Sequence, residues 1–167
     1  MRNIFTFIIL FVTAVAVNAA TYSTRSTGSW NSNIWNNGSS DVTWTTVLAG
    51  LASGDVLNIN HDITITGADI NLEAFNITIN LNATLSIEKK LRLSENSTVE
   101  FGSSGLIEGT GPGNSEKVSF GGVNVWTGND GNIPGPGTFD KTFTPGPGNP
   151  LPIVLVSFNV NSSSSNV

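Results

Sequence analysis

Between residues 55 and 107 the chain repeats one short pattern, in which an apolar, a polar and an apolar residue follow one another. Two apolar residues separated by one position lie on the same face of a β-strand, so each couplet predicts a short strand with one buried face. The couplets are Leu57/Ile59, Ile63/Ile65, Ile70/Leu72, Ile77/Ile79, Leu85/Ile87, Leu91/Leu93 and Val99/Phe101. Successive couplets begin 6 to 8 residues apart. A hairpin meander would need longer strands and dedicated two-residue turns.

Short strands at a small and nearly constant interval are typical of a β-solenoid, here with two or three couplets in each coil. Asparagine recurs within or beside the expected corners, where it tolerates left-handed backbone and can bond to its copies in neighbouring coils. These residues are Asn58, Asn60, Asn71, Asn76, Asn80, Asn82 and Asn96. The sequence therefore predicts an all-β fold, a right-handed parallel β-helix with an N-terminal cap and a Gly/Pro-rich C-terminal segment.

The first residues have the features of a signal peptide. Arg2 precedes an apolar run over residues 4–17, and small residues stand at Val17 and Ala19, the −3 and −1 positions of a cleavage site. The run is shorter than the roughly 20 residues needed to cross a bilayer. We therefore expect cleavage after Ala19 and a secreted mature chain that has no transmembrane segment, with release or association with the cell surface as the two alternatives.

The predicted organisation divides the chain into five regions. They are a signal peptide at 1–19, an N-terminal cap at 20–53, a β-solenoid at 54–122, a Gly/Pro-rich loop or linker at 123–150, and a C-terminal strand with a Ser/Asn tail at 151–167. Within the cap, Trp30 and Trp35 are expected to close the first coil. One or two helical turns at residues 45–53, with Leu48 and Leu51 on one face, are expected to assist them.

Composition excludes several classes of partner. Without Arg2 the chain carries six cations against 12 anions, and the basic residues cluster only at Lys89, Lys90 and Arg92. A nucleic-acid partner is therefore disfavoured. Cysteine is absent, which excludes disulfides and cysteine-ligated metals, so packing and backbone pairing must stabilise the fold. No cofactor is expected.

Several short motifs resemble known families. Residues 53–59, with a Gly54-Asp55 turn before a strand, resemble the entry into pectin-lyase-like right-handed β-helices. Residues 27–35, 119–131 and 151–158 are similar to segments of secreted surface proteins of the Bacteroidota. The resemblance implies a following fibronectin-III-like domain and a sorting domain for type IX secretion. Neither follows in this sequence, so we expect either a truncated relative or export by another route.

Acidic residues offer one candidate metal site. Asp55, Asp62 and Asp69 are spaced 7 residues apart and would form a calcium-binding ladder if they stacked on successive turns. Each also lies beside a predicted turn, where aspartate is common and needs no metal. His61, the sole histidine, stands next to Asp62 without a nucleophile motif and is interpreted as a solvated turn residue.

Tryptophans offer a second candidate site. Trp44 and Trp126 flank the predicted solenoid, and exposed indole rings can stack on sugar rings. The alternative for both residues is packing into the core. No catalytic residue is assigned, and the chain is not expected to be an enzyme.

The sequence thus predicts a non-catalytic extracellular β-solenoid module with a structural or adhesive role at the cell envelope. Its expected partners are extracellular glycans or envelope proteins. Two alternatives remain open: a glycan-binding module, and a fragment of a polysaccharide lyase or hydrolase of the β-helix class that uses Asp55, Asp62 or Asp69.

Overall fold

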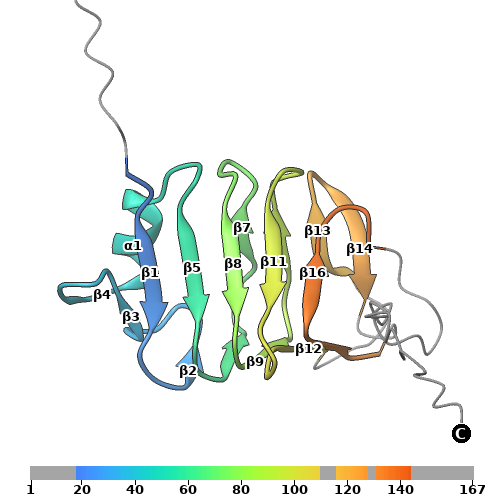
Figure 1. Cartoon of the computed structure of the whole chain (residues 1–167), viewed down its shortest axis with the longest axis horizontal. Coiled ribbons are helices and arrows are strands. Elements are labelled where there is room, and N and C mark those ends of the chain that lie inside the picture. The colour runs from blue at the N-terminus through green and yellow to red at the C-terminus, as the bar shows by residue number, and fades with distance from the viewer. Residues whose placement is uncertain (1–17, 110–115, 128–130, 144–167) are drawn as a thin grey trace, which may run out of the picture.

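The computed structural model describes residues 18–109, 116–127 and 131–143, and these residues form an all-β protein with one short helix. The strands form three sheets, in which most neighbours are parallel (Figure 1). Most of the predicted signal peptide and the whole of the predicted C-terminal strand and tail at 151–167 lie outside the described residues.

Nine strands make up the middle of the molecule as three successive groups of three. The first group is β5 (Val56–Ile59), β6 (Ile63–Ile65) and β7 (Ile70–Leu72). The second is β8 (Thr78–Leu81), β9 (Thr84–Ile87) and β10 (Leu91–Leu93). The third is β11 (Thr98–Phe101), β12 (Leu106–Gly109) and β13 (Glu116–Phe120).

Each strand of the first and second groups pairs in parallel with the strand three places further along the chain. Strands β5, β8 and β11 belong to sheet A, β6, β9 and β12 to sheet B, and β7, β10 and β13 to sheet C. In sheet A, Leu57 is opposite Ile79, which is opposite Val99. Residues that stack on one another in this sheet are therefore 22 positions apart between β5 and β8, and 20 positions apart between β8 and β11. The shorter interval of 6 to 8 residues between couplets carries the chain from one sheet to the next.

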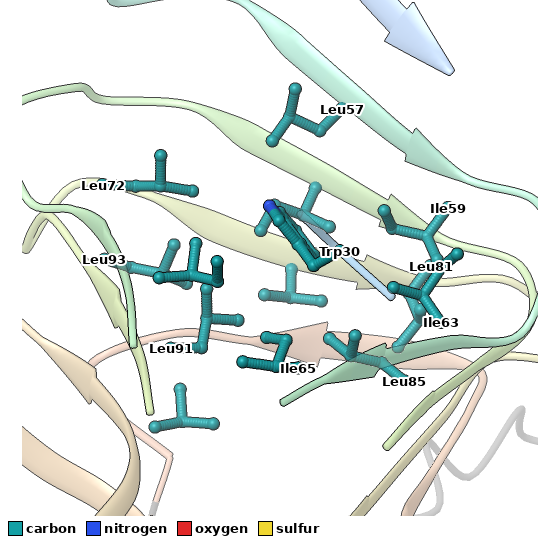
Figure 2. Close-up of a cluster of buried hydrophobic side chains, with 14 of the residues drawn as sticks. Trp30, Leu57, Ile59, Ile63, Ile65, Leu72, Leu81, Leu85, Leu91 and Leu93 are labelled. Carbon is teal, nitrogen blue, oxygen red and sulfur yellow. The ribbon is translucent and has the colours of Figure 1, made fainter. Parts of the chain in front are cut away.

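The apolar side chains of all three sheets point to a common interior, where they pack against one another (Figure 2). All 14 residues of the predicted couplets are buried, with at most 6% of their surface exposed. The alternation of buried and partly exposed positions along β8, β9 and β11 matches the period of two that the couplets predict. The predicted strands and their buried faces are confirmed.

At the N-terminal end, two short strands continue the parallel stacking and two more add an antiparallel edge. Strand β1 (Thr21–Thr24) pairs with β5, and β2 (Gly28–Ser29) pairs with β6. Strands β3 (Trp35–Asn36) and β4 (Asp41–Val42) extend sheet A beyond β1. Trp30 and Trp35, which are expected to close the first coil, are fully buried.

Helix α1 (Trp44–Gly50) begins at Thr43, whose side-chain hydroxyl accepts a hydrogen bond from the amide of Thr46. Trp44 and Val47, three positions apart, form its buried face. The predicted Leu48/Leu51 face is therefore half wrong, because Leu51 is buried whereas Leu48 is 38% exposed. No helix in the described residues is long and apolar enough to cross a membrane.

At the C-terminal end, the chain runs back across all three sheets. Strands β14 (Val123–Thr127), β15 (Ile133–Pro134) and β16 (Gly137–Phe139) pair antiparallel with β13, β12 and β11. The described residues of this segment thus differ from the loop or linker predicted for 123–150. Glycine permits close backbone approach here, since the Gly135 amide donates to the Gly105 carbonyl over 2.8 Å.

Candidate functional site

The three predicted calcium ligands do not lie together. Asp55 precedes β5, Asp62 precedes β6 and Asp69 precedes β7, so each stands before a strand of a different sheet. Because stacked positions in the first and second groups of strands are 21 or 22 residues apart, a spacing of 7 moves a residue to the next sheet rather than to the next level. The expected carboxylate ladder is therefore not formed. Within the described residues, no group of three or more His, Asp or Glu side chains is arranged to hold a metal ion.

Each of these aspartates instead accepts hydrogen bonds from backbone amides. Asp62 Oδ1 accepts a hydrogen bond from the amide of Thr84 over 3.0 Å, which links one strand group to the next. Asp69 Oδ1 accepts from the amide of Lys90 over 3.2 Å in the same way. Asp55 is 2% exposed and accepts two backbone amides. These contacts agree with the turn interpretation of the three residues.

The two tryptophans proposed as sugar platforms are both inside the protein. Trp44 is 7% exposed and Trp126 is 1% exposed. The Trp44 ring packs on Trp30, with ring centroids 5.4 Å apart, and Trp126 Nε1 donates to the carbonyl oxygen of Gly131 over 2.9 Å. Their indole faces are therefore not available for stacking on a sugar, and the alternative of core packing holds for both.

His61 is positioned by a backbone group and not by an acid. Its Nδ1 lies 3.0 Å from the carbonyl oxygen of Thr24, to which it donates a hydrogen bond. The carboxylate of the neighbouring Asp62 bonds to Thr84 instead. The histidine–carboxylate contact that orients a general base is thus not made by this pair.

The outward side of sheet A carries a regular array of mostly polar residues. We call it the asparagine face, and it comprises Thr21, Ser23, Val56, Asn58, Thr78, Asn80, Thr98, Glu100 and Thr138. These residues alternate along their strands with the buried couplet residues. They form two rows that run across the strands, which lie side by side in Figure 1. Adjacent positions in a row are about 4.8 Å apart, the spacing of paired strands.

Hydrogen bonds between side chains hold one of these rows in place. Asn58 Nδ2 donates to Ser23 Oγ over 3.2 Å, and Asn80 Nδ2 donates to Asn58 Oδ1 over 2.9 Å. At the C-terminal end of the row, Thr138 Oγ1 donates to Glu100 Oε2 over 2.6 Å. The amides therefore keep one orientation along the row, with donors and acceptors in a fixed order.

A second asparagine ladder follows the corner after sheet A. Asn82 Nδ2 donates to Asn60 Oδ1 over 3.0 Å. The backbone amide of Asn60 donates to Thr24 Oγ1 over 2.9 Å. The ladder ends at Gly102. A side chain has no room at this position, because an added Cβ would lie 2.3 Å from Asn82 Oδ1. The corner therefore supplies a third line of polar groups beside the two rows of the asparagine face.

The outward sides of sheets A and B each carry one acidic residue among those named here, and the outward side of sheet C carries a cation. On the asparagine face, Glu100 is the one charged residue. The side of sheet B carries Glu108, which accepts from Ser86 Oγ over 2.5 Å. The side of sheet C carries Arg92, paired with Asp69 over 3.5 Å. The asparagine face is thus nearly neutral and rich in hydroxyl and amide groups, which suits hydrogen bonding to an extended ligand better than acid–base chemistry.

One buried titratable group lies at the N-terminal end of sheet A. Tyr22, on β1, is 8% exposed. Burial raises the pKa of its phenol, and the nearby negative charge of Asp55 raises it further. The phenol is therefore a neutral core group and not an acid or base for catalysis near neutral pH.

The couplet pattern identified which residues point outward, because they stand between two buried ones. It did not identify which of them are neighbours, since in sheet A that depends on the step of 20 to 22 residues between paired strands. The recurrence of Asn58 and Asn80, 22 positions apart, was the available signal for this step.

Comparison with protein-family models, with curated proteins and with solved structures finds no match to this chain.

Proposed function

We propose that this chain is an exported module built as a short right-handed parallel β-helix, with a non-catalytic structural or adhesive role at the cell envelope. The asparagine face is its contact surface, and extracellular glycans or envelope proteins are its partners. The observation that carries the proposal is the pair of nearly neutral polar rows on sheet A, held in register at the strand spacing.

The strand pairing supports the helical stack. Each of the three sheets contains one strand from each group of three, so the chain passes from sheet A to sheet B to sheet C and then returns to sheet A. Connections between parallel strands are almost always right-handed, which favours that hand for the stack. A stack of this kind is stiff along its axis, because each group packs on the next.

The ordering of the face supports a binding role. Asn58 and Asn80 are already fixed by their mutual hydrogen bond, so a ligand that contacts this row has little side-chain motion to restrain. Hydroxyl and amide groups such as those of Thr78 and Asn80 can both donate and accept, as sugar hydroxyls do. A glycan chain laid across the strands would meet a hydroxyl, amide or carboxylate group at each level.

The two alternatives receive less support from the structure. A glycan-binding module that stacks sugars on Trp44 or Trp126 would need these buried rings to become exposed. A lyase or hydrolase that uses Asp55, Asp62 or Asp69 would have to work without a cluster of these carboxylates, because they stand before strands of three different sheets. Calcium separates the enzyme alternative, which predicts a thermal midpoint raised by millimolar Ca²⁺, from our proposal, which predicts no change.

Two matched substitutions test the contact surface. Thr78→Arg places a long cation in the middle of the asparagine face, and Thr64→Arg places the same group on the outward side of sheet B. Both positions are partly exposed on central strands. We expect Thr78→Arg to abolish retention of the mature protein on washed cell envelopes or on pectin, alginate or mucin glycans, and Thr64→Arg to leave it unchanged.

Equal retention of both variants would contradict the assignment of the face. Release of cleaved sugar products from any of these glycans by the wild-type protein would contradict the non-catalytic role. Circular dichroism of each variant establishes that the β-structure is retained before binding is compared.

A further inference from the structure

Asp55 is a carboxylate placed almost entirely inside the protein. It is 2% exposed, and it stands in the turn that joins α1 to β5. Its Oδ2 accepts a hydrogen bond from the amide of Ala52 over 2.8 Å, which closes that turn. Burying a carboxylate is unfavourable unless a positive charge or several hydrogen bonds compensate it. The ion pairs found in the described residues are Arg25–Asp41, Arg92–Asp69 and Lys141–Glu95, and Asp55 takes part in none of them.

The other carboxylate oxygen of Asp55 faces the start of the first strand. Its Oδ1 lies 2.7 Å from the backbone nitrogen of Ala20. The following peptide is fixed as well, because the carbonyl oxygen of Ala20 accepts from the amide of Val56 over 2.9 Å, and Thr21 is in register with Val56. The nitrogen of Ala20 is therefore held at the carboxylate by parallel pairing of β1 with β5.

Ala20 is also the residue that follows the predicted cleavage site. While Ala19 is attached, the nitrogen of Ala20 is a neutral amide with one proton. Hydrolysis of the Ala19–Ala20 peptide bond consumes one water, leaves a carboxylate on Ala19 and converts this nitrogen into an ammonium group.

We propose that Asp55 is the binding site for the new N-terminus, so that removal of the signal peptide creates an ion pair between the Ala20 ammonium and the Asp55 carboxylate and thereby stabilises the mature fold. The proposal rests on cleavage after Ala19 and is independent of what the asparagine face binds. In the uncleaved chain a neutral amide already donates to this carboxylate over 2.7 Å, and processing adds a full positive charge to the donor, which turns the hydrogen bond into an ion pair.

The pH dependence of this pair has a defined sign. An α-amino group has an ordinary pKa of about 8, and pairing with a carboxylate raises it. The added stability is therefore complete below about pH 8 and is lost as the pH rises through the higher pKa of the folded state. From β1, Tyr22 faces Asp55 and stays neutral in this range because its own pKa is raised. The α1–β5 turn contributes the neutral amide of Ala52.

The test compares two N-terminal forms of the chain in three backgrounds. One form begins at Ala20 and the other keeps Ala19, which moves the ammonium one residue away. The backgrounds are wild type, Asp55→Asn and Asp62→Asn. Asp62 is the matched control, because it also accepts a backbone amide but lies before β6, away from Ala20.

We expect the form that keeps Ala19 to melt about 2–6 °C below the Ala20 form at pH 7, in wild type and in Asp62→Asn. In Asp55→Asn the two forms should melt together. Equal midpoints for the two wild-type forms, or the same difference in all three backgrounds, would overturn the proposal.

Two further measurements keep the test independent of whether Asp55→Asn folds. Amine-directed acylation at pH 7 should modify the N-terminus of the folded wild-type protein about tenfold more slowly than that of a peptide of residues 20–27, because a pKa raised by one unit leaves about a tenth of the free amine. Equal rates would count against the pair. N-terminal sequencing of the exported protein should begin at Ala20, and any other first residue would remove the premise.

Discussion

The two ends of the stack are closed in different ways. At the N-terminal end, three indole rings pack together: the centroids of Trp30 and Trp35 are 5.2 Å apart, as are those of Trp35 and Trp44. At the C-terminal end, each of the three sheets receives one antiparallel strand, and Phe139 on the last of these packs on Phe120 with centroids 5.5 Å apart. One end is closed mainly by side chains, and the other mainly by backbone pairing.

The difference shows two solutions to the same problem. A stack of parallel strands leaves unpaired backbone groups and an open apolar interior at both ends. Antiparallel strands at the C-terminal end satisfy the edges of β11, β12 and β13 directly. At the N-terminal end the extra antiparallel strands extend sheet A only, and the tryptophans fill the interior. The N-terminal end should therefore be sensitive to loss of side-chain volume, and the C-terminal end to obstruction of the backbone.

The largest effect is expected at the N-terminal end. Trp30→Ala removes a fully buried ring that contacts two other tryptophans, and should lower the free energy of unfolding by about 3–5 kcal/mol. Denaturant unfolding followed by circular dichroism measures this change. A loss below about 1 kcal/mol would show that the ring cluster does not close this end.

A milder pair of changes at the same end separates ring packing from hydrogen bonding. Trp30 Nε1 is buried without a hydrogen-bond partner, whereas Trp35 Nε1 donates to the carbonyl oxygen of Trp30 over 2.9 Å. Trp30→Phe should therefore be less destabilising than Trp35→Phe, which leaves a buried carbonyl without its donor.

The second-largest loss of stability is expected from a change at the C-terminal end. An added Cβ at Gly105 would lie 2.3 Å from the carbonyl oxygen of Leu81, a backbone atom that cannot move aside easily. Gly105→Ala should lower the free energy of unfolding by about 1–3 kcal/mol and increase amide exchange in β15 and β16 before β5. The exposed neighbour Ser103 serves as control, and Ser103→Ala should leave both quantities unchanged. Uniform exchange across all strands would contradict a locally closed end.

A smaller loss of stability is expected from a change in the asparagine row, which lies between the two ends. Asn80→Ala removes the side-chain hydrogen bond to Asn58 and should lower the free energy of unfolding by about 0.5–1.5 kcal/mol. The exposed Asn96 has a backbone contact to Ser94, and its side chain is in no ladder, so Asn96→Ala should change stability by less than about 0.5 kcal/mol. Equal thermal midpoints for the two variants would show that the ladder orders the face without stabilising it.

The smallest effect is confined to high pH. Because the pKa of Tyr22 is raised in the folded protein, its contribution to stability is complete below about pH 10 and is lost as the pH rises above that value. Tyr22→Phe should therefore reduce the fall in thermal midpoint above pH 10 while changing the midpoint at pH 7 little. An unchanged alkaline slope would contradict the burial of this phenol.

The sequence predicted the middle of the molecule well because period-two burial depends only on local spacing. Leu57, Ile59 and the other couplet residues are all buried as expected, and all lie on strands except Ile77, which directly precedes β8. The calcium site failed because the interval of 7 that links Asp55, Asp62 and Asp69 was assigned to stacking, whereas it carries the chain to the next sheet.

The ends were harder to predict, because closure depends on contacts distant in sequence. The sequence predicts Trp30 and Trp35 as cap residues but leaves Trp44 open between an exposed platform and core packing, and the structure shows that Trp44 packs against both of these rings. The Gly/Pro-rich segment was interpreted as a linker. In the structure, Gly135 and its neighbours allow short strands to pair with β11 and β12. Local composition did not distinguish a flexible linker from a tight antiparallel return.

The central claim is that residues 22 positions apart in β5 and β8 stack on the same outward face, and paired cysteines test it most directly in a chain that has none of its own. Asn58→Cys with Asn80→Cys should oxidise to an intramolecular disulfide, because paired strands bring these positions within disulfide range. Asn58→Cys with Thr64→Cys, on two different sheets, should remain reduced under the same conditions. Intact mass and thiol titration report both. A disulfide in the second pair and free thiols in the first would contradict the stacking on which the account rests.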